Sequence, residues 1–309
     1  SSAEKLAMAE NEETISGDSQ EQENILLTLN YESMVDKTVN LGLLVKNHSN
    51  TQNMFGLNVI NENKNDSSVK NAEKILDYAV KIASAADVQL RPLTRFDNDV
   101  INGINNVVKE QKITDLIIVL QDQKGFSASF ADNLYNGYLQ NDNINTLIYH
   151  AAQPISTIKR YMVMIPENSH LESGFFHSLA RIWNIGRNSG AIMHFYAPEN
   201  IITLLIYIVI KANIEAEFNV THSWKDTEKI AENIKDDEGL ILILARQGMR
   251  SYFPKMRNIH DFLNNHLRHR NYLLLYPYSK QDDYSKDIRS VRNHDDFVEI
   301  GSIIKKIFK

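Results

Sequence analysis

Apolar and polar residues follow two patterns that alternate along the chain from Ile25 onward. Short apolar runs such as "NILLTLN", "MFGLNVIN" and "DLIIVL" have the composition of buried parallel strands. The segments between them, such as "SVKNAEKILDYAVKIASAA", place apolar residues at i, i+3, i+4 and i+7, which predicts amphipathic helices. Strands that alternate with helices predict parallel pairing and right-handed crossovers.

This series of strands and helices occurs twice. "RYMVMIP" reopens the pattern after "NTLIYH" has closed it, and "GLILILA" and "YLLLYPY" stand where "DLIIVL" and "NTLIYH" stand in the first series. We therefore expect an α/β fold with two tandem five-stranded, mostly parallel sheets flanked by helices. The expected parts are a polar linker at 1–23, domains at 24–152 and 159–278, and a charged tail at 279–309.

The composition narrows the class of protein. Of 309 residues, 43% are hydrophobic and 23% are charged, which is typical of a globular protein with real cores. The formal charge of -6 argues against nucleic acid as a partner, and the lack of cysteine excludes disulfides and thiolate chemistry. The most apolar run, 201–210, is about half a membrane span. We expect it either to lie in the core of its own repeat or to be covered by the first repeat, by a second chain or by an adjacent membrane domain.

The order of these elements resembles the universal stress protein domain, here in tandem over about 24–277. The fourth strands "TDLIIVL" and "EGLILILA" and the closing strands "NTLIYH" and "YLLLYP" carry the resemblance. It implies five-stranded α/β sandwiches. Nucleotide-binding members of that family have an aspartate after the first strand and the pattern G-x-x-G-x(9)-G-[ST] after the fourth.

The nucleotide-binding positions of that family are degenerate in this chain. In the first repeat, Asn30 stands at the aspartate and Leu120, Gln123 and Asn133 stand at the glycines. In the second repeat, the corresponding residues are Asn168, Ala245, Gly248 and Asn258. Because glycine is what allows a backbone to close around a phosphate, we expect no ATP and no other cofactor at these loops.

A narrower resemblance lies in "ILILARQGMRSYFPKMRNIHDFLNNHLRHRNYLLLYP". This arrangement is similar to the cytoplasmic C-terminal region of bacterial cation/proton antiporters. It implies a regulatory or assembly domain that is joined to a membrane antiporter domain and lies on the cytoplasmic side of the bacterial inner membrane as a homodimer. The alternative is a free-standing tandem universal stress protein that binds a nucleotide or another small anionic ligand.

The loop "ARQGMRSY" is the best candidate for a ligand site. It follows a buried strand at the carboxyl edge of the predicted sheet, where ligands bind in open α/β folds. Its arginines, next to a helix N-terminus, could hold a small anion. The candidate residues are Arg246, Gln247, Gly248, Arg250, Ser251 and Asn168. The other interpretation is that the arginines contact acidic groups of the first repeat or of another subunit.

No catalytic or metal site is predicted. His266 and His269 in "HLRHR" are spaced to share a metal, but no third ligand lies nearby in sequence, and a helix C-terminus favours such cations anyway. The chain lacks G-x-S-x-G, and Ser251 has no assigned His and Asp partners. We expect that the protein is not an enzyme.

Overall fold

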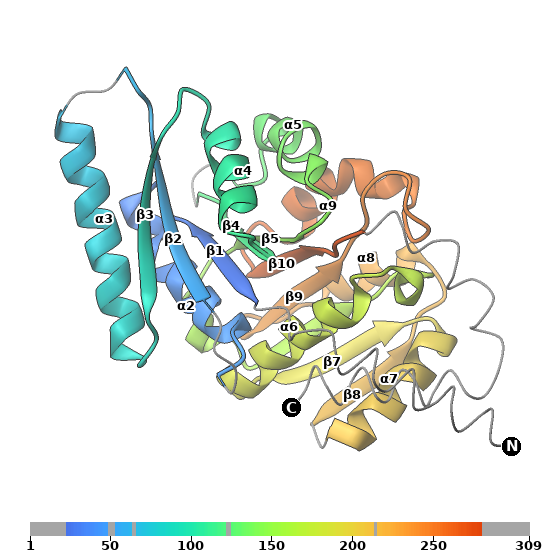
Figure 1. Ribbon diagram of the computed structural model, residues 1–309. Coiled ribbons are helices and arrows are strands. Elements are labelled where there is room, and N and C mark those ends of the chain that lie inside the picture. The colour runs from blue at the N-terminus through green and yellow to red at the C-terminus, as the bar shows by residue number, and fades with distance from the viewer. Residues whose placement is uncertain (1–22, 49–52, 64–65, 122–124, 213–214, 280–309) are drawn as a thin grey trace, which may run out of the picture.

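The computed structural model describes residues 23–48, 53–63, 66–121, 125–212 and 215–279. One sheet of ten strands runs through the molecule in the order β3-β2-β1-β4-β5-β10-β9-β6-β7-β8 (Figure 1). The first half contributes β1 (Asn24–Thr28), β2 (Asn53–Ile60), β3 (Leu90–Phe96), β4 (Asp115–Val119) and β5 (Asn145–His150). The second half contributes β6 (Arg160–Met164), β7 (Ile192–Ala197), β8 (Ala216–Val220), β9 (Glu238–Ile243) and β10 (Tyr272–Tyr276).

Both halves have the same strand order. In the first half β1 pairs with β2 and β4, and in the second half β6 pairs with β7 and β9, all in parallel. Strands β5 and β10 pair antiparallel and join the halves. The α/β class with a mostly parallel sheet is confirmed. The two separate sheets that the repeat suggested are one continuous sheet, because this pairing covers the edge strand that each half would expose.

Helices cover both faces of the sheet. One face carries α2 (Val35–Val45), α3 (Asp66–Ala85), α6 (Phe175–Ser189) and α7 (Glu199–Ala212). The other carries α4 (Val100–Glu110), α5 (Ala128–Asn136), α8 (Trp224–Glu232) and α9 (Ile259–His266). The 3-10 turns are η1 (Glu32–Met34), η2 (Tyr138–Gln140), η3 (Ile155–Thr157), η4 (Ser169–Leu171) and η5 (Pro254–Asn258). Polar N-cap residues set the start of several helices. In α5 the N-cap is Ser127, whose hydroxyl accepts a hydrogen bond from the N–H of Phe130.

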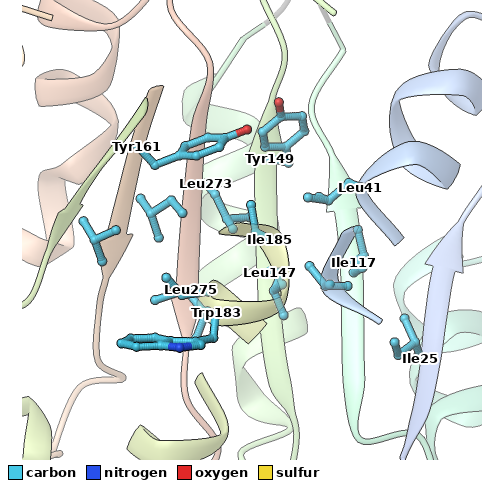
Figure 2. Packing of buried hydrophobic residues seen from close by; sticks show 14 of the residues in the cluster. Ile25, Leu41, Ile117, Leu147, Tyr149, Tyr161, Trp183, Ile185, Leu273 and Leu275 are labelled. Carbon is cyan, nitrogen blue, oxygen red and sulfur yellow. The ribbon is translucent and has the colours of Figure 1, made fainter. Parts of the chain in front are cut away.

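The core on each face of the sheet continues across the join between the halves. Figure 2 shows Leu147 of β5 beside Leu275 of β10, and these two residues are paired in register. Ile185 and Trp183 of α6 lie over them on the face that α2 shares. All four side chains are essentially inaccessible to solvent. We therefore expect the described part of the chain to unfold as one unit rather than as two.

Helix α6 also forms a buried ion pair with the first half. Its Arg181 donates from Nε and Nη2 to the two carboxylate oxygens of Asp115 at 2.9 and 2.8 Å. The remaining nitrogen, Nη1, lies 2.9 Å from Glu23 Oε2. Asp115 accepts further hydrogen bonds from Thr114 Oγ1 and Asn145 Nδ2. Both members of the pair are buried, so each charge depends on the other.

The charge of Asp115 ties the stability of this join to pH. Burial opposes ionisation, but the positive charge of Arg181 and the hydrogen bonds to the carboxylate hold the pKa of Asp115 below its usual range. An unfolded aspartate has a pKa of about 3.9. The stabilisation is therefore fully present above about pH 4 and is lost as the pH falls through the lower folded pKa.

Buried tyrosines make the fold sensitive to alkali. Burial raises the pKa of Tyr135 and of Tyr138 to about 12. Since an unfolded tyrosine ionises near pH 10, their contribution is complete below about pH 10 and is lost as the pH rises through the folded pKa. We expect tyrosinate absorbance of the native protein to lag behind that of the urea-unfolded chain. Full ionisation of every tyrosine near pH 10, with the circular dichroism unchanged, would contradict this.

The apolar helix α7 packs on its own half of the sheet. Ile201, Leu205 and Ile208 are fully buried there, and the helix lies against β7 and β8. Ile206 keeps 40% of its surface exposed, and the side chain of Ile210 lies outside the described residues. Within the described residues, no helix combines the length and apolar character that a membrane crossing requires.

Candidate functional site

A cavity of about 470 Å³ lies at the carboxyl edge of the second half. Residues that follow β6, β7, β8 and β9 line it, among them Pro166, Pro198, Thr221 and Arg250. Its place matters because the strand order reverses between β6 and β9. Open α/β sheets bind ligands at such a reversal, outside the carboxyl ends of the strands. We call this cavity the edge cavity.

Three of the residues predicted from sequence lie in the edge cavity: Asn168, Arg250 and Ser251. Asn168 has a left-handed backbone with φ of 65°, a conformation that asparagine tolerates better than most residues. Ser251 is buried, and both its N–H and its hydroxyl donate to Glu172 Oε1 at 2.7 Å. Glu172 therefore fixes the loop after β9, whereas Arg250 is exposed at the cavity.

The start of α8 forms the opposite wall of the edge cavity. Ser223 and Asp226 form a capping box there, and backbone N–H groups of His222 and Ser223 lower the pKa of Asp226. Trp224 lies with its ring 5.1 Å from that of Phe253, which gives the wall an aromatic surface. These residues were not predicted from the sequence. The signal that could have found them is the Ser-x-x-Asp box directly after a strand.

The charges around the edge cavity are mixed. Arg250 is one cation, while Glu167 and Glu199 are carboxylates, and all three are exposed. A triphosphate would need several donors and little negative charge nearby. Aromatic surface with mixed polar groups suits a small polar organic molecule better than it suits ATP.

The corresponding region of the first half is filled by side chains. Leu120 is 2% exposed and Phe126 is fully buried, so these two residues of the described part of the loop after β4 pack into the core. Asn30 uses its amide oxygen to accept from the N–H of Val59. Asn133 is exposed on α5. Gln123 lies outside the described residues.

Arg246 holds the two halves together. Its side chain is 7% exposed, and its Nε donates to Leu139 O at 3.1 Å. Its Nη2 donates to Asn141 O and Ile144 O at 3.1 and 3.0 Å, and its Nη1 donates to Pro277 O. These acceptors are backbone carbonyls, mostly of the first half, rather than the acidic groups or the anion considered from sequence. Burial lowers the pKa of Arg246 to about 10.

Gln247 and Gly248 lie in a second cavity, at the join between the halves. This cavity of about 670 Å³ is bounded by α5 and η2 on one side and by η5, α9 and the loop after β9 on the other. We call it the seam cavity. Gly248 has φ of 92°, which favours glycine, and a side chain there would meet open space. The six predicted residues are therefore divided between two cavities.

Within the described residues, no group of three or more His, Asp or Glu side chains is arranged to hold a metal ion. His266 lies 3.9 Å from Glu232, and Arg270 pairs with Asp236 at 2.8 Å. Two residues of the "HLRHR" segment, at the end of α9, therefore lie next to carboxylates of the second half.

Sequence comparisons and structural comparisons give different results for this chain. No model of a known protein family matches the sequence, and no curated protein is similar to it in sequence. The crystal structure of a universal stress protein from Archaeoglobus fulgidus DSM 4304 is similar, with a TM-score of 0.52 and 13% identity, over 84% of this chain and 97% of that one. The chain has a universal stress protein-like fold. The family resemblance seen in the sequence is confirmed at the level of the fold.

Two further solved structures share this universal stress protein-like fold. The cytoplasmic domain of a prokaryotic cation chloride cotransporter has a TM-score of 0.56 at 9% identity, over 82% of this chain and 95% of that one. A protein of unknown function from Pseudomonas aeruginosa PAO1 has a TM-score of 0.56 at 11% identity, over 93% and 98%. At such identities the similarity concerns the fold alone. The fold therefore occurs in both free-standing and transporter-attached proteins.

Proposed function

We propose that this chain is a regulatory or assembly domain of a membrane cation/proton antiporter and that it does not bind ATP. The observation that carries the proposal is the filled carboxyl edge of the first half, where Leu120 and Phe126 occupy the core side of the loop after β4. A domain whose phosphate-binding loop is replaced by buried side chains can still contact other proteins, but it no longer binds a nucleotide there. The proposal assigns no catalysis to the chain.

The connection to a transporter has separate support. The segment "ARQGMRSY" resembles the corresponding segment of antiporter cytoplasmic regions, and its Arg246 is used to join the halves. The cytoplasmic domain of the cation chloride cotransporter shows that a transporter can carry this fold. Under this proposal the domain lies on the cytoplasmic side of the bacterial inner membrane and contacts the membrane domain of the same polypeptide.

The test begins with the open reading frame that encodes Ser1. We expect a set of long apolar spans upstream, and an initiating methionine close to Ser1 would contradict the proposal. Cation/proton exchange would then be measured in inverted membrane vesicles for the full protein and for a form that ends before residue 24. We expect exchange to persist with an altered dependence on pH or cation concentration. An identical dependence in both forms would exclude a regulatory role.

Self-association is part of the proposal and can be tested on α7. Ile206 exposes 40% of its surface, and the neighbouring residues of the helix are largely buried. We expect Ile206→Asp to weaken a dimer without unfolding the chain, as measured by sedimentation velocity. Val100→Asp, at a residue 38% exposed on α4, is the matched control. An unchanged sedimentation coefficient for Ile206→Asp would assign the dimer to another surface or exclude it.

The second candidate function is that of a free-standing protein with a small ligand in the edge cavity. The observation that favours it is the position of Arg250, Asn168 and Trp224 around a cavity at the strand-order reversal. Replacement of Arg250 by alanine would then abolish binding of an anionic ligand. A free-standing protein of this kind would bind a nucleotide or another small anion, whereas the antiporter proposal predicts that ATP does not bind.

A further inference from the structure

The seam cavity contains a buried cation whose charge is not neutralised by contact. Arg246 is more than nine-tenths buried and lines this cavity, yet its hydrogen-bond acceptors are backbone carbonyls and the Thr146 hydroxyl. No carboxylate of the described residues forms an ion pair with it. Burial of a charge without a counter-ion is costly, and this cost lowers the pKa of Arg246. A guanidinium has five N–H groups, and the second one on Nη1 has no acceptor among the described residues.

A carboxylate from the other half lines the same cavity. Asp142 is close enough to act electrostatically on Arg246, but the two side chains do not meet in an ion pair. The side chain of Asp142 makes no hydrogen bond with a described residue, although its carbonyl accepts from the N–H of Ser279. Asp142 and Arg246 thus present opposite charges to one space without neutralising each other.

The remaining charged side chains of the cavity repeat this division. Asp132 of α5 belongs to the first half, and Arg257 of η5 belongs to the second. Arg257 is exposed and has no ion-pair partner among the described residues. Negative charge therefore comes from the wall of the first half and positive charge from the wall of the second. Amide side chains, among them Asn136 and Gln247, also line the cavity, and Asn136 Nδ2 donates to Asp132 Oδ1 at 2.6 Å.

From this division of charge we infer that the seam cavity binds a small zwitterion, with its carboxylate toward Arg246 and Arg257 and its ammonium group toward Asp142 and Asp132. A volume of about 670 Å³ is in the range of small-molecule sites, which occur preferentially at interfaces between domains. A molecule with a single charge would be attracted to one wall of the cavity and repelled by the other. The bound zwitterion would bridge the halves and stabilise the join. The inference does not depend on the antiporter proposal.

The test uses the full chain and three matched sets of probes in calorimetry at low salt. The zwitterions are 4-aminobutanoate and 6-aminohexanoate, the anions are butanoate and hexanoate, and the cations are the corresponding alkylamines. We expect at least one zwitterion to bind, and its two singly charged analogues to bind about tenfold more weakly or worse. Failure of both zwitterions at millimolar concentration, or equal binding of an anion or an amine alone, would overturn the inference.

Four variants locate the site. Asp142→Asn and Arg257→Gln remove one charge from each wall and leave Arg246, which joins the halves, in place. Each should weaken binding of the zwitterion by about tenfold. Asp77→Asn on α3 and Arg187→Gln on α6 make the same changes at exposed residues outside the cavity, and they should bind as the unchanged chain does. Binding that is insensitive to Asp142→Asn and Arg257→Gln would overturn the inference, and so would equal weakening in all four variants.

Discussion

The Asp115→Ala variant should lose about 3–5 kcal/mol of unfolding free energy at neutral pH, because it leaves the guanidinium of Arg181 buried without its bidentate partner. Glu23, whose side chain is 23% exposed, still contacts Arg181, so some compensation remains. Urea unfolding followed by circular dichroism measures the loss. A single transition is expected, since the cores on both faces of the sheet continue across the join.

Two further variants separate the unpaired charge from other effects of Asp115→Ala. Combination with Arg181→Met removes both charges and should restore at least half of the loss. Asp77→Ala, an exposed aspartate on α3, should change stability by no more than about 0.5 kcal/mol. The unchanged chain should lose stability as the pH falls below about 4, and Asp115→Ala should lose less stability over the same range. A loss under about 1 kcal/mol for Asp115→Ala would contradict the account of the pair.

The Arg246→Ala variant should lose about 2–4 kcal/mol, because four backbone carbonyls would lose a charged donor. The carbonyls of Leu139 and Ile144 belong to the first half, so the loss should weaken the contact between the halves. Water in the seam cavity would recover part of the cost, which sets the lower end of this range.

Arg250→Ala is the matched control for Arg246→Ala. It lies in the same loop but is exposed, so we expect a change within about 0.5 kcal/mol. If Arg246 served only to hold a ligand and did not join the halves, its replacement would relieve a buried charge and stabilise the ligand-free protein. Unchanged or increased stability of Arg246→Ala would therefore contradict its assignment as a joining residue.

The fold was predictable from the sequence because its signals are local. Runs such as "DLIIVL" specify buried strands, and the recurrence of the strand and helix series reveals the two halves. The pairing of β5 with β10 was not predictable, because "NTLIYH" and "YLLLYPY" look alike whether they close separate sheets or meet each other. The pattern of apolar residues predicts which strands are buried, but it does not predict which other strand each of them pairs with.

The candidate site was predictable only in part, for a related reason. The position of "ARQGMRSY" after β9 correctly placed Arg250 and Ser251 at the carboxyl edge. Arg246 differs from Arg250 by its partners, and carbonyls such as Leu139 O are more than one hundred residues away in sequence. The pair of Arg181 and Asp115 was missed because Asp115 stands at the start of an apolar strand and Arg181 stands among apolar residues of a helix. A charge in such a segment is itself a signal for a buried partner.

Titration of the full chain with Mg-ATP in a calorimeter tests the central claim most directly. Leu120 and Phe126 are buried where the first half would need an open phosphate loop, and Arg246 donates to backbone carbonyls. We therefore expect no heat of binding at micromolar to submillimolar nucleotide. Micromolar affinity that requires magnesium would contradict the claim. If that affinity were lost in Arg250→Ala, the edge cavity would be a nucleotide site and the second candidate function would replace the first.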